Sequence, residues 1–392
     1  MNSFEFWMPT KIVFGEGTPE YAGEEVKAFG GSKVLVLYGS GSAVKSGVLE
    51  RVTNSLDKAG LHWKAIGGIK PNPLAEFAQQ IVDDYRDLGF DFLLAVGGGS
   101  VIDTAKAVAF GLCAPDTPIW DYFSRKAEPK ENLPVGVVLT IAAAGSETSN
   151  SAVLTMESQQ IKRGLSSQMN RPKFAIMDPS LTKTLPSRQT ACGIVDIMMH
   201  TLDRYFAEGT GNDITDGIAA TILRTVIKHG TIAMNEPDNM KARSELMWAG
   251  SVSHNGLTGL GQVRDFSVHQ FGQVLSAMFD TLHGESLSAM WASWARYVMD
   301  ADIPRFAKYA REIWDIDEAD ERKAAQKGID ATENYFRSLG MPVSLGETVG
   351  ILPEETLKVM ASKCGFGGGR KVGSLRALGE EEILQVYQNA NF

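Results

Sequence analysis

Four side chains in the second half of the chain could bind a metal ion together: Asp196, His200, His269 and His283. Asp196 and His200 are four residues apart in the helical pattern GIVDIMMH, so both leave one helix face and can converge on one ion. Their neighbours are apolar, and a buried carboxylate is costly unless it is paired or bound to a metal. His269 and His283 flank one apolar helical run, with His283 beside Gly284 at a helix end. Metal chemistry is therefore the leading interpretation.

Three nitrogen ligands and one oxygen ligand suit Fe²⁺, Zn²⁺, Co²⁺ or Ni²⁺ better than Mg²⁺ or Ca²⁺, which prefer oxygen ligands. A single histidine in such a segment is more often a core or surface imidazole, so the interpretation depends on the four residues occurring together. His62, His229 and His254 lie outside the set, and His254 in SVSHNGL could line the same cleft without belonging to a known motif. An ion with an open position could polarise an alcohol or carbonyl oxygen.

A second candidate site is glycine-rich. The run Gly97, Gly98, Gly99 and Ser100 follows the strand pattern DFLLAV and opens the helical pattern VIDTAKAVAFGL. Unobstructed backbone N–H groups and the positive end of a helix dipole can hold a pyrophosphate at such a place. The run is not the GxGxxG motif, and a plain strand-to-helix turn is the alternative. Its position favours dinucleotide binding.

The turn after KVLVLY bears on which dinucleotide is bound. Enzymes selective for NAD commonly place an acidic side chain at the ribose 2′-hydroxyl, and that carboxylate repels a 2′-phosphate. This turn has no acid; it offers Gly39, the hydroxyls of Ser40 and Ser42, and the cation of Lys45. We therefore predict NADP(H) over NAD(H), the alternative being a flexible turn with a solvated lysine.

The patterns around these sites predict an α/β fold followed by an all-α part. The runs KIVFG, KVLVLY, DFLLAV, PVGVVLT and KFAIMD read as strands separated by helices, which indicates a mainly parallel sheet. After DPSLTKTLPSRQ, apolar residues recur at helical spacing, with GFGGGRK as a loop before a closing helix EEEILQVYQ. The prediction is a dinucleotide-binding parallel-sheet domain, residues 1–184, and a helical metal-binding domain, residues 185–392, with a ligand cleft between them.

Composition narrows the class of partner. The chain has 392 residues, 44% of them hydrophobic, with a formal charge of −9 and a pI near 5.3, which argues against a nucleic-acid surface. The three cysteines show no CxxC spacing, so we expect no disulfides and a reducing compartment. The N-terminus does not read as a signal peptide, and the longest apolar stretch is too short to cross a bilayer. We expect a cytoplasmic protein with a small-molecule substrate.

The chain resembles the iron-containing, metal-dependent alcohol dehydrogenases, in particular their butanol dehydrogenase and NADPH-dependent aldehyde reductase branch. The likeness covers essentially the whole chain, and its most specific segments are those of the metal set. The matching segments are PTKIVFGEGT, KPNP, GGGSVIDTAKA, TIAAAGSE, KFAIMDPSLTKTLP, GIVDIMMHTLD, DFSVHQFGQVLSAMFDTLHG and the terminal glycine-rich loop.

The resemblance implies roles for individual residues. Asp196, His200, His269 and His283 would be the metal ligands, binding Fe²⁺ or Zn²⁺. Gly39 stands where NAD-selective branches carry an aspartate, in agreement with the electrostatic argument. A homodimer is also implied. The implied cofactor contacts are Asn72, Gly98, Ser100, Asp103, Thr140 and Lys162.

Two departures from the family pattern stand out. Four residues after the first histidine of DFSVHQ, the family usually has another histidine near the substrate, whereas this chain has Gln273. A glutamine amide can orient a substrate but cannot titrate near neutral pH. In TIAAAGSE, Ile141 and Ala144 replace side chains that could contact phosphate.

These observations predict a reversible NADP(H)-dependent alcohol dehydrogenase or aldehyde reductase acting on small aliphatic alcohols and aldehydes. The metal ligands and Gln273 would form its catalytic set. One alternative is a polyol dehydrogenase of the glycerol type, because fold alone does not decide the reaction. The other is a non-catalytic nucleotide-binding protein with a structural metal.

Overall fold

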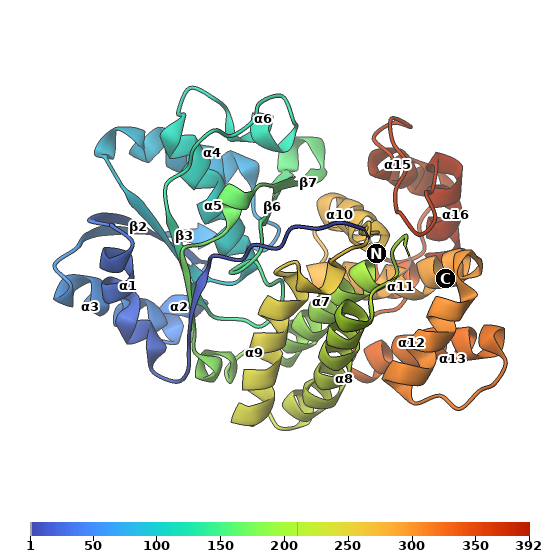
Figure 1. Ribbon diagram of the computed structural model, residues 1–392. Coiled ribbons are helices and arrows are strands. Elements are labelled where there is room, and N and C mark those ends of the chain that lie inside the picture. The colour runs from blue at the N-terminus through green and yellow to red at the C-terminus, as the bar shows by residue number, and fades with distance from the viewer. Residues whose placement is uncertain (1, 210) are drawn as a thin grey trace. The chain divides into compact units, whose positions relative to one another are not determined.

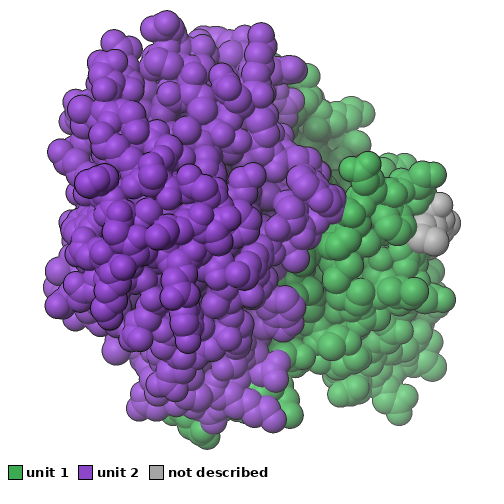
Figure 2. Space-filling view, turned by 60° about the vertical axis from the view of Figure 1, so that its left-hand side comes forward, with its two compact units in different colours: residues 1–6, 186–236, 252–392 green, residues 7–185, 237–251 purple. Residues whose placement is uncertain are grey.

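The computed structural model describes residues 2–209 and 211–392, which form two compact units (Figure 2). We call residues 7–185 and 237–251 the sheet unit, and residues 186–236 and 252–392, with the N-terminal residues up to Phe6, the helical unit. The segment 237–251 lies in the sheet unit because its side chains pack there: Met247 belongs to the core under the sheet, and Ser251 Oγ hydrogen-bonds Glu147. The units thus differ from the predicted domain ranges at both the N-terminus and this segment.

The sheet unit contains a six-stranded, fully parallel sheet in the order β1-β8-β5-β4-β2-β3. Figure 1 labels β2 and β3, the last two strands of this order. The five predicted strands are all in this sheet, which confirms the predicted parallel α/β fold. The strands of the unit are β1 Lys11–Phe14, β2 Lys33–Gly39, β3 His62–Ile69, β4 Phe92–Gly97, β5 Val135–Leu139, β6 Ser151–Met156, β7 Ile161–Ser166 and β8 Phe174–Met177.

Helices cover both faces of this sheet. Alternate residues of a strand point to opposite faces, so Leu35 and Leu37 of β2 pack in one apolar layer, while Val34 and Val36 pack in the other. The first layer is closed by α4, α5 and α6, and the second by α1 and α3. The helices of the unit are α1 Ala22–Ala28, α2 Ser42–Lys45, α3 Val48–Lys58, α4 Ala75–Tyr85, α5 Gly99–Cys113 and α6 Ile119–Phe123.

Three strands were not predicted from the sequence. The edge strand β3 is exposed or half-buried along HWKAIGGI up to its last residue, so it lacks the apolar run that marked the buried strands. The antiparallel pair β6 and β7 forms a separate two-stranded sheet, and β7 carries two adjacent cations in IKRGLS. Edge and hairpin strands like these pair through their backbones, and their side chains need not be apolar.

The helical unit confirms the predicted change from alternating strands and helices to helices alone. Beyond Pro186 the described chain forms helices and two isolated bridges, but no strand. GFGGGRK is a turn, and the closing helix is α16. The helices of the unit are α7 Ser187–Tyr205, α8 Asp213–Asn235, α10 Ser267–Phe279, α11 His283–Val298, α12 Ile303–Trp314, α13 Glu321–Ser338, α14 Leu345–Val349, α15 Glu354–Cys364 and α16 Glu380–Ala390. Helix α9, Met240–His254, belongs to the sheet unit up to Ser251, and its last three residues belong to the helical unit.

All three cysteines are free. Among the described residues, no helix has both the length and the apolar character needed to cross a bilayer.

Candidate metal and dinucleotide sites

Two helices of the helical unit carry the centre of the candidate metal site. The extended backbone of Pro186 precedes α7, which runs without interruption through Asp196 and His200. Helix α10 begins after Phe266, whose left-handed backbone (φ 59°) turns the chain sharply and places His269 in the first turn. A left-handed phenylalanine is uncommon and costs backbone energy, so the surrounding packing must hold it.

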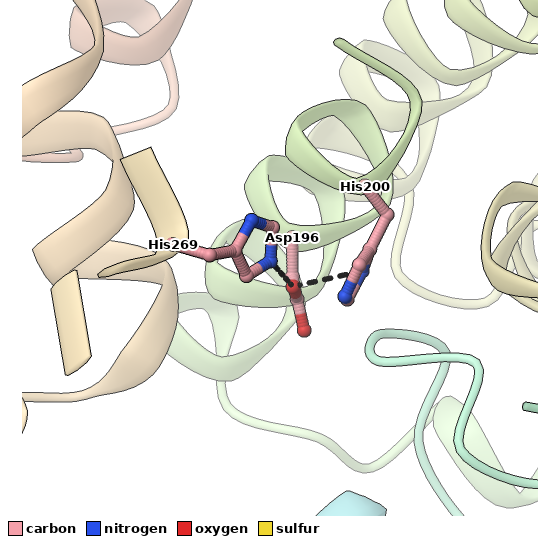
Figure 3. A group of neighbouring side chains, drawn as sticks. All are labelled: Asp196, His200 and His269. Atoms are coloured by element: carbon pink, nitrogen blue, oxygen red, sulfur yellow. Dashed lines mark ion pairs between the residues drawn. The ribbon is translucent and has the colours of Figure 1, made fainter. Parts of the chain in front are cut away.

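Asp196, His200 and His269 converge. One ligand atom from each lies within 4.8 Å of the others. The Oδ1 atom of Asp196 is 3.1 Å from Nδ1 of His200 and 3.7 Å from Nε2 of His269. Figure 3 shows the carboxylate between the two imidazoles, with the three side chains pointing toward one another from α7 and α10. They are 4%, 5% and 4% exposed, so the group is shielded from solvent.

The donor atoms of this group fit a divalent cation. Asp196 Oδ1, His200 Nδ1 and His269 Nε2 are buried, and none has a hydrogen-bond partner within residues 2–209 and 211–392. Buried polar atoms are rarely left in this state, because each costs about 1–3 kcal/mol. Three such atoms aimed at one another, two of them imidazole nitrogens, make a ligand set suited to Zn²⁺ or Fe²⁺.

His283 lies at the edge of the group. It is the first residue of α11, and so lies at a helix end as expected, and its Nε2 atom is 3.7 Å from Asp196 Oδ1. Its side chain is 28% exposed, in contrast to the three buried residues. The structure therefore brings all four predicted ligands around one carboxylate oxygen, with three of them in the tight group and His283 on the more open side.

The charge state of the histidines follows from their surroundings. Burial first, and the neighbouring His254 second, hold the pKa of His200 well below its usual range, so its ring is neutral at pH 7. Burial alone would lower the pKa of His269, but its carboxylate neighbours Asp196 and Asp203 raise it to about 9. A proton and a metal ion compete for the same nitrogen lone pair, so metal affinity must rise with pH.

Three further side chains at this site were not predicted from the sequence. Asp203, fully buried on α7, accepts a hydrogen bond from Nδ1 of His269, which leaves Nε2 of that ring facing Asp196. Arg204 donates to the carbonyl oxygen of His200, and Phe266 packs beside it. The spacing from Asp196 to Asp203 is seven residues, two helical turns on one face, and that spacing was a signal available in the sequence.

The glycine-rich turns of the sheet unit lie together at one edge of the sheet. Strands β2, β4 and β5 are parallel neighbours, with Gly97 paired to Leu139, so the residues that follow each strand share that edge. Gly98 caps α5, the backbone N–H of Thr140 donates to Gly97, and Gly39 ends β2. Helix α5 has no acidic residue in its first turn, which suits an anion. Also at this edge are Ser40, before α2, Ser42, which begins it, Gly99, which begins α5, and Ser100.

Packing also explains why two of these positions are glycines. A β-carbon on Gly98 would lie 2.3 Å from Cγ2 of Ile141, and one on Gly99 would lie 3.1 Å from Cβ of Ala144. A side chain on Gly98 would therefore overlap Ile141, whereas one on Gly99 would require a small shift of Ala144. Ile141 and Ala144, which depart from the family pattern, take part in these contacts.

The remaining predicted cofactor residues divide into two groups. Asn72, buried and with a left-handed backbone (φ 53°), accepts a hydrogen bond of 2.8 Å from Lys162 Nζ, so this pair is preassembled. Asp103 instead accepts from Ser146 Oγ at 2.6 Å and from the backbone N–H of Val153 at 2.9 Å. Both of its carboxylate oxygens hold neighbouring segments of the sheet unit.

Comparison with known proteins decides the family. The model of the family described as iron-containing alcohol dehydrogenase matches residues 9–179, and that of its C-terminal region matches residues 190–391. The chain belongs to the iron-containing alcohol dehydrogenase family. As a member of it, the protein is an NAD(P)-dependent alcohol oxidoreductase that uses a divalent metal.

Individual members of the family are similar over the whole chain. NADH-dependent butanol dehydrogenase A of Clostridium acetobutylicum is 38% identical, with full coverage of both chains. NADPH-dependent aldehyde reductase YqhD of Escherichia coli is 36% identical over 88% of this chain and 89% of its own. The crystal structure of NADH-dependent butanol dehydrogenase A of Thermotoga maritima superposes with a TM-score of 0.96 at 36% identity, covering 100% of this chain and 99% of that one.

These relatives place the chain in the butanol dehydrogenase and aldehyde reductase branch, as the sequence predicted. The protein is accordingly a metal-dependent alcohol dehydrogenase or aldehyde reductase, and neither a polyol dehydrogenase nor a non-catalytic binding protein is favoured. Within this iron-containing dehydrogenase, Gln273 lies on α10 one turn after His269 and is half-buried. The i, i+4 spacing puts it on the same helix face as that histidine.

Proposed function

We propose that the protein is an NADP(H)-preferring reductase of small aliphatic aldehydes that also oxidises the corresponding alcohols. Asp196, His200, His269 and His283 would hold one divalent ion, Fe²⁺ or Zn²⁺. The observation that carries the proposal is the convergence of three buried ligand atoms that have no hydrogen-bond partner in the described part of the chain.

The side chains of this chain would prepare the ligand set for its task. When bound, the cation polarises the substrate oxygen and the dinucleotide delivers or accepts hydride. His200 offers a neutral imidazole because burial lowers its pKa. Asp203 fixes the ring of His269 by accepting from Nδ1. The more exposed His283 marks the side of the set that is open to a substrate.

Gln273 would orient the substrate through its amide. An amide donates and accepts hydrogen bonds but does not titrate, so it cannot supply or remove the proton of the alcohol. Proton exchange would then use water or the hydroxyl groups of the cofactor. Replacing Gln273 with histidine would test this role, because only the histidine adds an ionisation to the pH profile of kcat/KM.

Residues of the sheet unit would bind the dinucleotide. The N–H groups at Gly97, Gly98 and Gly99 suit the pyrophosphate, with Ser100, Thr140 and the Asn72–Lys162 pair as further contacts. Asp103 would act by fixing the neighbouring segments through Ser146 and Val153.

The preference for NADP(H) rests on the turn at the end of β2. Gly39, Ser40 and Ser42 put no carboxylate where one would repel a 2′-phosphate. The names of the relatives divide on this point, since the butanol dehydrogenases are NADH-dependent and the aldehyde reductase is NADPH-dependent. The KM values for NADPH and NADH decide it, and a lower KM for NADH would contradict the preference.

The activity is tested with metal-stripped protein. Reduction of butyraldehyde is followed by NADPH absorbance before and after adding Fe²⁺ or Zn²⁺, and we expect turnover only after the addition. If neither ion restores NADPH oxidation with any aldehyde of a panel, the proposal is contradicted. Metal analysis of the isolated protein distinguishes iron from zinc. The implied homodimer stays a prediction, tested by light scattering.

A further inference from the structure

A fully buried guanidinium lies beside the candidate metal site. Arg204 is 1% exposed, and within the described chain no carboxylate oxygen lies within ion-pair distance of it. Burying a cation without an ionic partner is costly unless its N–H groups find acceptors. Two nitrogens of Arg204 find acceptors, both in the surroundings of His200, whereas its Nε atom has no hydrogen-bond partner among the described residues.

The first acceptor is the backbone carbonyl oxygen of His200 itself, which binds Nη1 of Arg204. The second is Nδ1 of His254, which lies 2.9 Å from Nη2. The face of the Phe266 ring completes the surroundings, with the guanidinium carbon 4.7 Å from its centroid. Arg204 of α7 therefore contacts the carbonyl group of His200, the imidazole of His254 at the end of α9, and the residue that precedes α10.

This contact decides the tautomer of His254. An arginine side chain only donates hydrogen bonds, so Nδ1 of His254 must be the acceptor and the ring hydrogen must be on Nε2. Burial, and next the neighbouring Arg264, lower the pKa of Arg204 to about 9, which still leaves it protonated and donating at neutral pH. The imidazole of His254 is thereby held in one plane and in one chemical form.

His254 in turn packs against His200. Their ring centroids are 3.9 Å apart at an interplanar angle of 52°, closer than the 4.4 Å between His200 and His269. Asp203 supports the ring of His269 but not that of His200. The contact with His254 limits rotation of the His200 ring about its side-chain bonds.

We propose that Arg204 and His254 act as a positioning pair for His200, the guanidinium fixing the His254 imidazole and that imidazole holding the His200 ring in the plane that a divalent cation requires. The inference rests on the proposed function, because it takes His200 to be a metal ligand. Groups that support a ligand in this way change metal affinity by about 10–100-fold when they are removed.

Metal affinity, measured by competition with a colorimetric chelator, is the test. Zn²⁺ is the probe, and the absorption spectrum of the Co²⁺-loaded protein reports ligand geometry. We expect His254→Leu to weaken Zn²⁺ binding about 10–100-fold and to change the Co²⁺ spectrum. His254→Gln should lose less, because its amide oxygen can still accept from Arg204. The matched control is His229→Leu, which removes a buried imidazole of α8 outside the ligand set and should leave the affinity within about twofold.

The outcomes separate this inference from the proposed function. If His254→Leu binds Zn²⁺ as the parent does, with an unchanged Co²⁺ spectrum, the positioning pair is refuted while the metal site stands. If the parent binds metal but reduces no aldehyde, the proposed function fails. The Zn²⁺ affinities of the parent and the His254 variants still show whether Arg204 and His254 position His200. A parent that binds no metal overturns both. If circular dichroism shows that His254→Leu does not fold, the same measurements are made on Arg204→Lys. Its single ammonium group cannot hold both acceptors in the same geometry, so we expect weaker Zn²⁺ binding.

Discussion

The carboxylate of Asp203 accepts a hydrogen bond from Nδ1 of His269. His269 is one of the three buried side chains that converge in the helical unit. This contact fixes the ring so that Nε2 faces Asp196. It also connects two helices, since Asp203 is on α7 and His269 is on α10. A residue outside the ligand set thus determines which nitrogen a metal can reach.

Removing this support should weaken metal binding. We expect Asp203→Ala to lower the affinity for Zn²⁺ by about 10–100-fold, because the His269 ring loses both its orientation and its carboxylate partner. Asp203→Asn keeps an acceptor oxygen without the charge and should lose less. Chelator competition at one fixed pH measures both, and equal affinities for the alanine variant and the parent would contradict the role.

The position of His283 depends on a glycine contact. A β-carbon on Gly284 would lie 2.5 Å from Cα and 2.6 Å from the carbonyl oxygen of Cys192, which are backbone atoms of α7 that cannot move aside. Gly284→Ala should therefore displace the start of α11, costing about 1–3 kcal/mol of stability and lowering aldehyde reduction. Urea unfolding and steady-state rates measure the two effects.

Gly217 provides the matched control. It lies in α8, is exposed, and a β-carbon there would meet nothing within 4 Å. Gly217→Ala should raise stability by up to about 1 kcal/mol through helix propensity and leave activity unchanged. Equal behaviour of the two variants would show that close packing at Gly284 is unimportant.

The cofactor preference can be reversed at Gly39. A β-carbon there would lie 3.6 Å from the carbonyl oxygen of Ile69 and 3.8 Å from Val101, ordinary contacts that leave room for a side chain. We expect Gly39→Asp to lower the ratio of kcat/KM for NADPH to that for NADH by about 10–100-fold, because a carboxylate repels the 2′-phosphate. Gly39→Asn has the same shape without the charge and should change the ratio far less. If Gly39→Asp leaves the ratio of kcat/KM for NADPH to that for NADH unchanged, the 2′-phosphate does not bind at this turn.

Acid should destabilise the helical unit through Asp216. Burial alone would raise the pKa of Asp216, but hydrogen bonds from Arg305 and Lys308 hold it below its ordinary value of about 3.9. A carboxyl whose pKa is lower in the folded chain contributes stability that is complete above the unfolded pKa and is lost as pH falls through the folded one. The stability contributed by Asp216 is therefore lost below about pH 4.

Urea unfolding at pH 7, 5, 4 and 3 tests this linkage. The parent should lose more stability between pH 5 and pH 3 than Asp216→Asn, which has no ionisation to lose. At pH 7 we expect Asp216→Ala to cost about 3 kcal/mol, because it leaves the buried guanidinium of Arg305 without its carboxylate. Parallel pH profiles for the parent and the asparagine variant would rule out a depressed pKa.

Much of the fold could be read from local patterns. Strands buried on both faces are continuous apolar runs, so KVLVLY and DFLLAV were recognisable, and so was the change to helical spacing after Pro186. The exposed edge strand β3 and the hairpin of β6 and β7 were not recognisable, because their pairing depends on backbone hydrogen bonds to a neighbour that sequence does not display.

By itself, the sequence determined that Asp196 and His200 share a helix face, that His283 lies at a helix end, and that glycines follow two buried strands, since each of these is a matter of spacing within one element. Only the tertiary structure decided that His269 lies next to Asp196, that Asp203 hydrogen-bonds the His269 ring, and that Arg204 hydrogen-bonds His254 beside His200. Those contacts join different helices or different turns of one helix through side-chain packing, whose geometry no local pattern encodes.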